Sequence, residues 1–229
     1  MTTTRIRRCG EAALLVDCPD LAHAVALARE LERLRPEAVA VVPAARTVLV
    51  SARDAAALPA LRRRVEEVLD AAPGQGVGAD GEVVVTRTVT IDVRYDGPDL
   101  ADVADLAGVS VEALVRRHTS VTWRAAFGGF APGFCYLVDS VELTHRPAAP
   151  ARDPEVQALP AVPRLGTPRT RVPTGSVGMA DRFCAVYPGA SPGGWRLLGT
   201  TDAVLWDADR PDPALLAPGD AVVFRDAGR

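Results

Sequence analysis

Two arginines with the spacing of an anion-binding pair stand in a run that contains glycine turns. Arg169 and Arg171 are two positions apart and are followed by Gly175 and Ser176. Side chains two positions apart on an extended chain point to the same face, so both guanidiniums could bind one carboxylate or phosphate. Solvated surface arginines without a ligand are the alternative, and the spacing does not separate the two. The Gly-Ser-Val-Gly run at Ser176 lacks the GxSxG spacing of a nucleophile elbow, so we expect no covalent serine mechanism.

A second candidate is the glycine pair Gly193 and Gly194, which precedes Trp195. Without a Cβ these residues let the backbone approach a ligand closely, and their free amides could donate hydrogen bonds to an anion. A tight hairpin turn that places Trp195 in the core is the alternative. The sequence leaves both interpretations open.

Aromatic residues and a histidine complete the candidate set. Phe130 and Phe134 flank a turn at Gly133, so one ring could line an apolar pocket while the other packs inward, with core packing as the alternative for each. His118 ends a predicted helix, where the helix dipole favours a protonated imidazole that could act as an acid or a base. A plain helix-terminal histidine is the alternative, and the catalytic residues are otherwise unassigned.

The residue types that the chain lacks exclude several kinds of site. All 26 basic residues are arginine, so no lysine can form a Schiff base, and neither a Walker-type phosphate loop nor a kinase-type ATP site fits this chain alone. The 3 histidines form no HExxH pair, so we expect no metal site. The 4 cysteines show neither a CxxC pair nor regular spacing, and we expect reduced, mostly buried thiols.

Length and charge indicate a globular protein without strong electrostatic attraction to nucleic acid. The chain has 229 residues, 48% of them hydrophobic, a net charge of −3 and a pI near 5.7. These values allow a sizeable core but not the positive field that drives binding to a phosphate backbone. No segment of about 18 consecutive apolar residues occurs, and no long apolar run follows the basic residues 1–8. We therefore expect a cytoplasmic protein with no membrane or nucleic-acid partner.

Residues 1–75 predict a small α+β domain. Apolar runs alternate with helical periodicity, and Asp20 and Asp54 stand where helix N-caps belong. The predicted strands are 12–16, near 39 and 47–51, and the predicted helices are 20–35 and 54–70. Residues 73–81 contain a literal GxGxxG pattern, but a helix precedes it and a strand follows, the reverse of a dinucleotide-binding turn. We interpret this segment as a linker.

Residues 82–229 predict a second, mainly-β domain. A Val- and Thr-rich strand at 82–95 is followed by two short helices, 99–106 and 110–118, with Asp99 and Ser110 as N-caps. After Val121 the helical periodicity ends, and short apolar pieces separated by Gly and Pro indicate strands joined by long ordered loops. Further strands are predicted at 195–198, 203–206 and 221–224, with a tight turn at 218–220.

The candidate runs stand in an order that is typical of a known family. The motifs span residues 89–224 and include 95–100, 118–119, 129–137, 168–178, 187–188, 191–195 and 218–220. In this order and separation they resemble the family of the 5-oxoprolinase B component, also called allophanate hydrolase subunit 1, which includes a sporulation-kinase inhibitor.

The resemblance implies a fold, partners and a reaction. The fold is an α+β N-terminal domain followed by a mainly-β, cyclophilin-like barrel domain. The partners are a homologous cyclophilin-like protein, of the 5-oxoprolinase C component or allophanate hydrolase subunit 2 type, and a third hydrolase subunit. Together the family's subunits use ATP to open the lactam of 5-oxo-L-proline. We expect ATP with magnesium at the level of the complex and no tightly bound cofactor in this chain.

We therefore expect an enzyme subunit that is inactive alone, namely the B component of an ATP-dependent 5-oxoprolinase that converts 5-oxo-L-proline to L-glutamate. In this hypothesis the arginine and glycine runs bind an anionic substrate or a phosphorylated intermediate. The chain departs from the family pattern at residues 180–186, which leaves another small amide or lactam open as substrate. One alternative is an inhibitor or regulator of a sensor histidine kinase. Another is the matching subunit of an allophanate- or urea-processing amidohydrolase.

Overall fold

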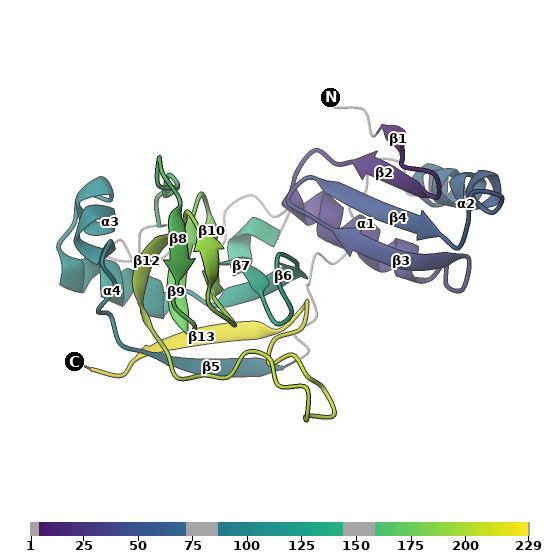
Figure 1. Cartoon of the computed structure of the whole chain (residues 1–229). Coiled ribbons are helices and arrows are strands. Elements are labelled where there is room, and N and C mark those ends of the chain that lie inside the picture. Colours follow the sequence, from purple (N-terminus) through teal and green to yellow (C-terminus); the bar gives the residue numbers. More distant parts are fainter. Residues whose placement is uncertain (1–4, 72–86, 144–158, 229) are drawn as a thin grey trace. The chain divides into compact units, whose positions relative to one another are not determined.

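The structure, a computed structural model, describes residues 5–71, 87–143 and 159–228 (Figure 1). These residues divide into two compact units, 5–71 and 87–228, except that Glu142 and Leu143 group with the first. Each unit has a hydrophobic core of its own. The predicted linker at 73–81, with its GxGxxG pattern, lies outside the described residues, and the predicted domain limits stay a prediction.

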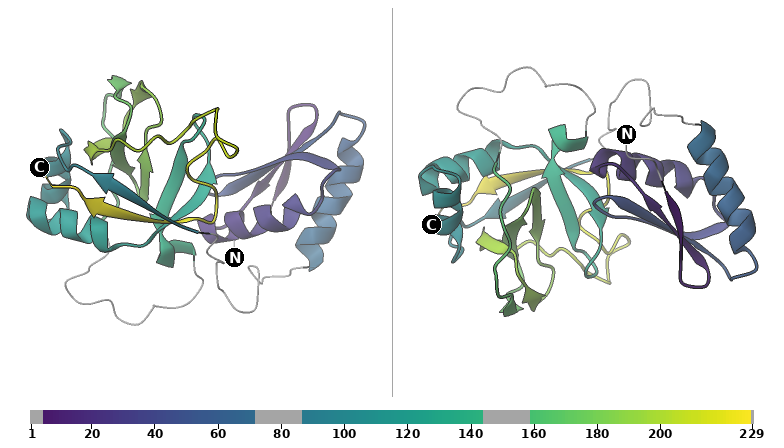
Figure 2. Two further views of the ribbon diagram at one scale, coloured as in Figure 1. Left: turned by 90° about the horizontal axis from the view of Figure 1, so that it is seen from below. Right: turned by 90° about the horizontal axis from the view of Figure 1, so that it is seen from above.

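The first unit is a four-stranded antiparallel sheet with two helices packed on one face (Figure 2). Alternate residues of the two central strands are buried, and these side chains form one core with both helices. The predicted helices and strands of this segment are confirmed, with helix bounds that differ by a few residues. The elements are β1 (Ile6–Cys9), β2 (Ala13–Asp17), α1 (Leu21–Glu32), β3 (Ala38–Pro43), β4 (Thr47–Ala52) and α2 (Leu58–Ala71), and the strand order is β1-β2-β4-β3.

The second unit is built on a seven-stranded sheet that closes almost completely into a barrel. Its end strands are joined by one bridge, in which Arg94 and Thr200 exchange two backbone hydrogen bonds of 2.8 Å. Its order is β12-β9-β10-β7-β6-β13-β5, and β5 and β13 are parallel. The strands are β5 (Thr88–Val93), β6 (Trp123–Gly128), β7 (Cys135–Asp139), β9 (Ser176–Ala180), β10 (Phe183–Val186), β12 (Arg196–Thr200) and β13 (Ala221–Asp226).

Helices and a separate two-stranded ribbon complete this unit. Helices α3 (Leu100–Leu106) and α4 (Val111–Ser120) pack against the barrel core, which contains Val103 and Leu114. Strands β8 (Arg169–Val172) and β11 (Ser191–Gly193) pair with each other outside the barrel sheet, and a 3-10 turn, η1, spans Ser140–Leu143. The fold is therefore mixed α and β with a nearly closed barrel.

Three of the four predicted N-caps accept a backbone hydrogen bond from the residue three positions later. Asp20 immediately precedes α1 and Ser110 immediately precedes α4, and both side chains accept such a hydrogen bond. Asp54 does so as well, but α2 begins only at Leu58. The prediction for Asp99 is wrong, because its side chain makes no capping hydrogen bond and instead binds groups on two strands.

The predicted strand at 203–206 is also wrong. In this irregular segment Leu205 is buried in the barrel core, but Val204 and Trp206 are both exposed. Its apolar side chains therefore imitate a strand pattern without forming one. The turn predicted at 218–220 is confirmed by a hydrogen bond from the Asp220 amide to the carbonyl of Ala217.

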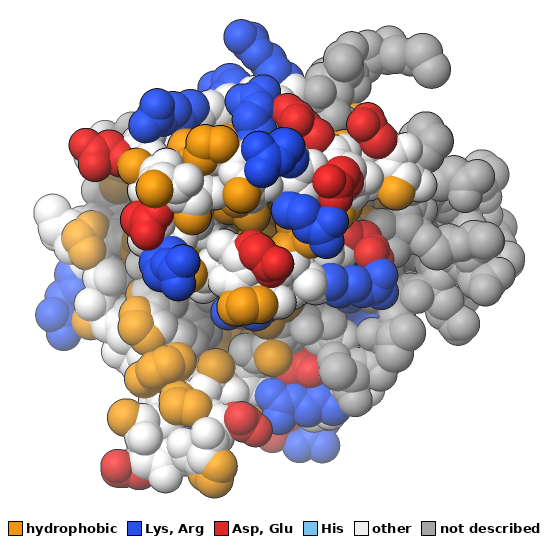
Figure 3. Space-filling view, turned by 90° about the vertical axis from the view of Figure 1, so that its right-hand side faces the viewer, with side chains coloured by type: hydrophobic (Ala, Val, Ile, Leu, Met, Phe, Trp, Pro, Cys, Tyr) orange, Lys and Arg blue, Asp and Glu red, His pale blue; other side chains and the backbone are white. Residues whose placement is uncertain are grey.

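Within the described ranges, no helix is long and apolar enough to cross a membrane. Figure 3 shows one face of the molecule, on which arginine side chains are interspersed with aspartate and glutamate side chains. On α2, Arg62 pairs with Glu66 and Arg64 pairs with Glu67.

Candidate functional site

The tertiary structure brings together three runs that the sequence singled out, namely 129–134, 168–178 and 191–195. Strands β8 and β11 are antiparallel neighbours, with Gly193 opposite Arg169. The run 129–134 joins them through Phe134, whose ring centroid lies 5.6 Å from that of Trp195. Segments more than 50 residues apart in sequence thus meet on one part of the second unit.

Seven aromatic rings gather where the runs meet, and we refer to them as the aromatic cluster. Phe134 and Tyr187 are buried within it, whereas Phe130 is 60% exposed and Tyr136 is partly exposed. Of the two predicted phenylalanines, one therefore packs inward and the other projects into solvent. The members of the cluster are Phe127, Phe130, Phe134, Tyr136, Phe183, Tyr187 and Trp195.

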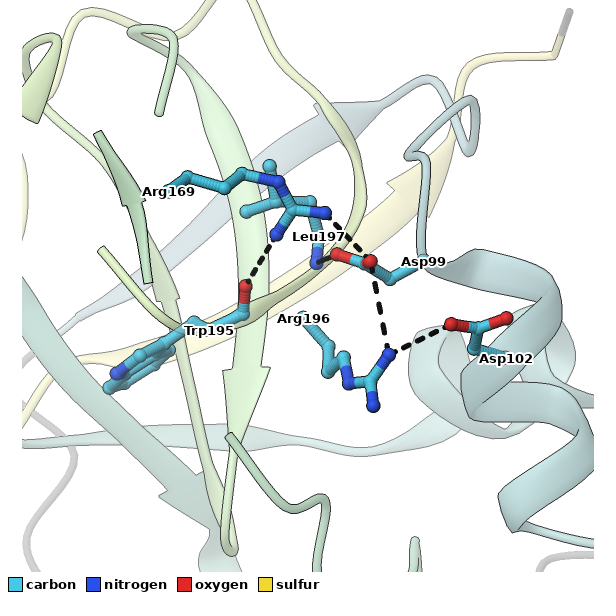
Figure 4. A network of polar contacts seen from close by, with 6 residues as sticks. All are labelled: Asp99, Asp102, Arg169, Trp195, Arg196 and Leu197. Atoms are coloured by element: carbon cyan, nitrogen blue, oxygen red, sulfur yellow. Dashed lines mark hydrogen bonds and ion pairs between the residues drawn. The ribbon is translucent and has the colours of Figure 1, made fainter. Parts of the chain in front are cut away.

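A buried carboxylate next to the cluster binds groups from two strands (Figure 4). Asp99 accepts a hydrogen bond of 2.7 Å from the backbone N–H of Leu197 and another of 2.7 Å from Nη2 of Arg169. Nη1 of Arg196 lies 4.0 Å from the same carboxylate and donates to Asp102 at 2.8 Å. Asp99 therefore ties the beginning of α3 to both β8 and β12.

The two arginines of the predicted anion pair have different surroundings. Arg169 is partly buried, and besides Asp99 it contacts the carbonyl oxygen of Trp195 at 3.3 Å. Arg171 is exposed, and no described residue forms a hydrogen bond or ion pair with its guanidinium. The guanidinium of Arg169 is thus paired with the carboxylate of Asp99, and the N–H donors of the Arg171 guanidinium are available to a ligand.

Two of the predicted glycines allow the chain to approach itself. Gly175 has a φ of +78°, and a Cβ placed on it would lie 2.2 Å from the carbonyl oxygen of Thr201. A Cβ on Gly193 would lie 2.6 Å from the hydroxyl oxygen of Tyr187. The need for glycine at these positions is therefore explained by the fold, without a ligand.

The remaining predicted residues also have intramolecular contacts. Gly133, with a φ of +80°, packs against the backbone of Leu205. The carbonyl oxygen of Gly194 accepts a hydrogen bond of 2.8 Å from the Leu165 amide. Ser176 is 1% exposed, which leaves its hydroxyl out of reach of a surface ligand.

His118 lies fully buried in the barrel core, where its surroundings favour the neutral imidazole. Its Nδ1 is 2.8 Å from the hydroxyl of Tyr95, and its Nε2 is 3.3 Å from the Cys184 sulfur. Burial lowers the pKa of His118 to about 3. The predicted protonated imidazole is therefore wrong, because burial outweighs a helix dipole that supplies at most about 2 kcal/mol. A side chain enclosed in this way does not contact substrate.

The cysteines are free thiols, and none resembles an activated nucleophile. Cys9 is exposed and the other three are buried, as predicted. Burial raises the pKa of Cys18 to about 11 and that of Cys135 to about 12, so both stay protonated at neutral pH. In the part of the chain that the structure describes, no three His, Cys, Asp or Glu side chains could hold a metal ion.

Several polar groups in and beside the three runs are already paired within the chain. The Gly175 amide donates to the carbonyl oxygen of Tyr187, the Leu197 amide donates to Asp99, and Arg169 pairs with the same carboxylate. A phosphate cradle needs such donors free and convergent. We therefore assign no nucleotide phosphate contact to these donors.

Several residues of this region escaped the sequence analysis. Asp102 gave no signal, because a single charged residue in a helix resembles any solvated one. Arg196 ends the glycine run that the sequence singled out, but it was not selected as a site residue. Asp99 was assigned as a helix cap because a carboxylate before a helix has the same pattern whether or not it caps. Tyr136, a member of the aromatic cluster, and Arg164, whose charge acts on Tyr136 and Tyr187, were not selected as site residues either.

Comparisons with known proteins agree with the sequence resemblance. The family described as carboxyltransferase domain, subdomain C and D, matches residues 4–216. A curated protein from Escherichia coli O157:H7, named as the B subunit of 5-oxoprolinase, is 42% identical over 142 residues, which are 61% of this chain and 58% of that protein. The chain thus covers less than two thirds of that relative.

Solved structures match over nearly the whole chain. The crystal structure of TTHA0988 in space group P6522 is 32% identical with a TM-score of 0.70, covering 94% of this chain and 40% of that one. The crystal structure of Kluyveromyces lactis urea carboxylase is 17% identical with a TM-score of 0.71, covering 97% of this chain and 22% of that one. At that identity the second likeness shows the fold alone.

Proposed function

The chain belongs to the family of the carboxyltransferase domain, subdomain C and D, and we propose that it is the B component of an ATP-dependent 5-oxoprolinase complex. The complex converts 5-oxo-L-proline to L-glutamate with Mg·ATP. The observation that carries this proposal is the 42% identity to a protein named as the B subunit of 5-oxoprolinase. The match covers 61% of this chain and 58% of that protein, and the reaction and the partners are part of the proposal.

The partners in this proposal are a homologous cyclophilin-like subunit and a third hydrolase subunit. The described residues of this chain support a shared site. His118 is enclosed in the core, the buried thiols are protonated, and the chain has no lysine. The groups that activate the amide must then come largely from the partners, and the chain alone is inactive.

The contribution of this chain is to bind an anionic substrate or a phosphorylated intermediate. Of the two arginines predicted for that role, Arg171 is the one whose guanidinium is exposed and has no partner among the described residues. The anion proposal on β8 therefore rests on Arg171, with Arg169 holding the strand in place through Asp99.

Reconstitution tests this function. Co-expression with the homologous and the third subunits should yield a stable complex whose ATP hydrolysis depends on 5-oxo-L-proline, and omission of this chain should abolish that dependence. Urea and allophanate are assayed in parallel.

ATP hydrolysis that depends only on urea or allophanate would identify that compound, in place of 5-oxo-L-proline, as the substrate. No activity with any of the three compounds would contradict an enzymatic role. A sensor-kinase autophosphorylation assay then tests the regulatory alternative.

A further inference from the structure

The exposed edge of the aromatic cluster carries a strained and protruding phenylalanine. Phe130 has a φ of 68° and is 60% exposed, although its ring contacts those of Phe134 and Tyr187 edge-on at 5.1 and 6.2 Å. A bulky residue in the left-handed region is uncommon and indicates a position that its surroundings enforce. Here the turn is held by Gly133, which packs against the backbone of Leu205.

Tyr136, which shares the ring of Phe134 as a neighbour with Phe130, presents a partly exposed phenol. Its ring is 5.1 Å from that of Phe134 and 5.6 Å from that of Trp195, and it stacks on Phe127 at 4.5 Å. Three neighbouring rings therefore fix the orientation of Tyr136. No described residue forms a hydrogen bond with its hydroxyl.

A cation lies close to the phenols at this edge. Leu165 donates its amide proton to the carbonyl oxygen of Gly194, which places the preceding residue, Arg164, beside the run that contains Trp195. Burial raises the pKa of Tyr136 and of Tyr187, and the positive charge of Arg164 opposes both shifts. Arg164 is exposed, and no described carboxylate pairs with it.

We infer that Phe130, Tyr136 and Arg164 form a binding site for a small planar carboxylate. The guanidinium of Arg164 binds the carboxylate of the ligand, and the phenol hydroxyl of Tyr136 forms a hydrogen bond with a polar atom of the ligand. The exposed ring of Phe130 covers the planar part of the ligand. The inference deepens the proposed function and rests on it for the identity of the ligand, because 5-oxo-L-proline is a small lactam with one carboxylate.

Nuclear magnetic resonance of the ¹⁵N-labelled full chain tests the site directly. The chain is titrated with 5-oxo-L-proline, with benzoate and with uncharged 2-pyrrolidinone. Both carboxylates should shift the amide signals of residues 129–136 and 164–165, and 2-pyrrolidinone should bind at least about tenfold more weakly. Shifts elsewhere, or none with either carboxylate, would overturn the inference.

Variants separate the site from general charge effects. Arg164→Gln should weaken carboxylate binding about tenfold, and Tyr136→Phe should weaken it by a smaller factor. Arg116→Gln, at an exposed arginine of α4 in the same unit, serves as the matched control and should bind as the wild type does. Equal binding by Arg164→Gln and Arg116→Gln would overturn the assignment of the cation.

The inference and the proposed function fail in distinguishable ways. Binding of benzoate without 5-oxo-L-proline supports a planar-carboxylate site and contradicts the lactam as its ligand. A reconstituted complex that hydrolyses 5-oxo-L-proline with the same KM in Arg164→Gln and wild type overturns the site, and the proposed function stands.

Discussion

Asp99 and Arg169 form an internal ion pair between two segments of the chain that lie 70 positions apart. The Asp99 side chain is 6% exposed, and the Arg169 side chain is 27% exposed. A buried charge that loses its partner is costly, because the remaining group keeps its desolvation penalty without the compensating contact. The pair therefore stabilises the junction of α3, β8 and β12.

Replacement of Arg169 should destabilise the protein, and replacement of Arg171 should not. We expect Arg169→Ala to lower the free energy of unfolding by about 2–3 kcal/mol, because Asp99 loses its charged donor. Arg171→Ala, two positions away on the same strand, should change it by less than about 0.5 kcal/mol, since its side chain is exposed. Urea denaturation measures both, and equal stability of the two variants would contradict the role of Arg169.

The neutral state of His118 should make stability depend on pH. The folded-state pKa is about 3, below the unfolded value of about 6.5, so folding excludes the proton. With respect to His118, the free energy of unfolding has its full value above pH 6.5, and it declines as the pH falls from 6.5 toward 3. At pH 5 the loss attributable to His118 should be roughly 2 kcal/mol relative to pH 7.5.

Two measurements check the His118 prediction. The imidazole signals of His118 should stay those of the neutral ring at pH 5 in nuclear magnetic resonance spectra. His118→Gln should show a smaller loss of stability than the wild type between pH 7.5 and pH 5 in urea denaturation. An imidazole that becomes protonated between pH 7 and pH 5 in the folded protein would refute the prediction.

At the scale of elements, barrel closure depends on close contact between β12 and the end of β5. A Cβ on Gly199 would lie 2.2 Å from the carbonyl oxygen of Arg94, which also forms the bridge to Thr200. Backbone cannot move away from such a contact without breaking the bridge. The glycine is therefore required by the approach of two strands.

Gly199→Ala should open the barrel at this bridge. We expect a loss of about 3 kcal/mol in the free energy of unfolding, because the added methyl group forces the two backbones apart. Gly189→Ala is the matched control, since a Cβ at Gly189 meets nothing within 4 Å, and its effect should stay below about 0.5 kcal/mol. Hydrogen exchange at the Arg94 and Thr200 amides should increase only in Gly199→Ala, and unchanged protection would count against this role of the glycine.

At the scale of the whole molecule, the two compact units have separate hydrophobic cores. The core of the first unit contains residues of β2, β4, α1 and α2, and that of the second contains residues of the barrel strands with α3 and α4. A segment with its own core is able to fold alone.

Separate expression tests this organisation. We expect residues 82–229 to unfold cooperatively on their own and to give dispersed amide signals in nuclear magnetic resonance spectra. Residues 1–75 should do the same with lower stability, because a smaller segment buries a smaller fraction of its surface. A non-cooperative transition in the longer fragment would show that its core depends on the rest of the chain.

The sequence by itself determined the features that short-range physics governs. The helices near 20–35 and 110–118 follow from apolar periodicity, and the caps Asp20 and Ser110 act on amides three positions away. The order of the glycine, proline and arginine runs was also sufficient to indicate the family. The segment at 203–206 was wrongly predicted as a strand because its four residues are all apolar, although Val204 and Trp206 are exposed and Leu205 is buried.

Only the tertiary structure decided what the candidate residues contact. Asp99 meets the amide of Leu197, 98 positions away, instead of capping its own helix. His118 is neutral because distant strands enclose it, and Arg169 and Arg171 differ because one of them faces Asp99. The burial of a side chain and its charged partners depend on residues that are distant in sequence and that folding brings close. The local sequence does not identify those residues.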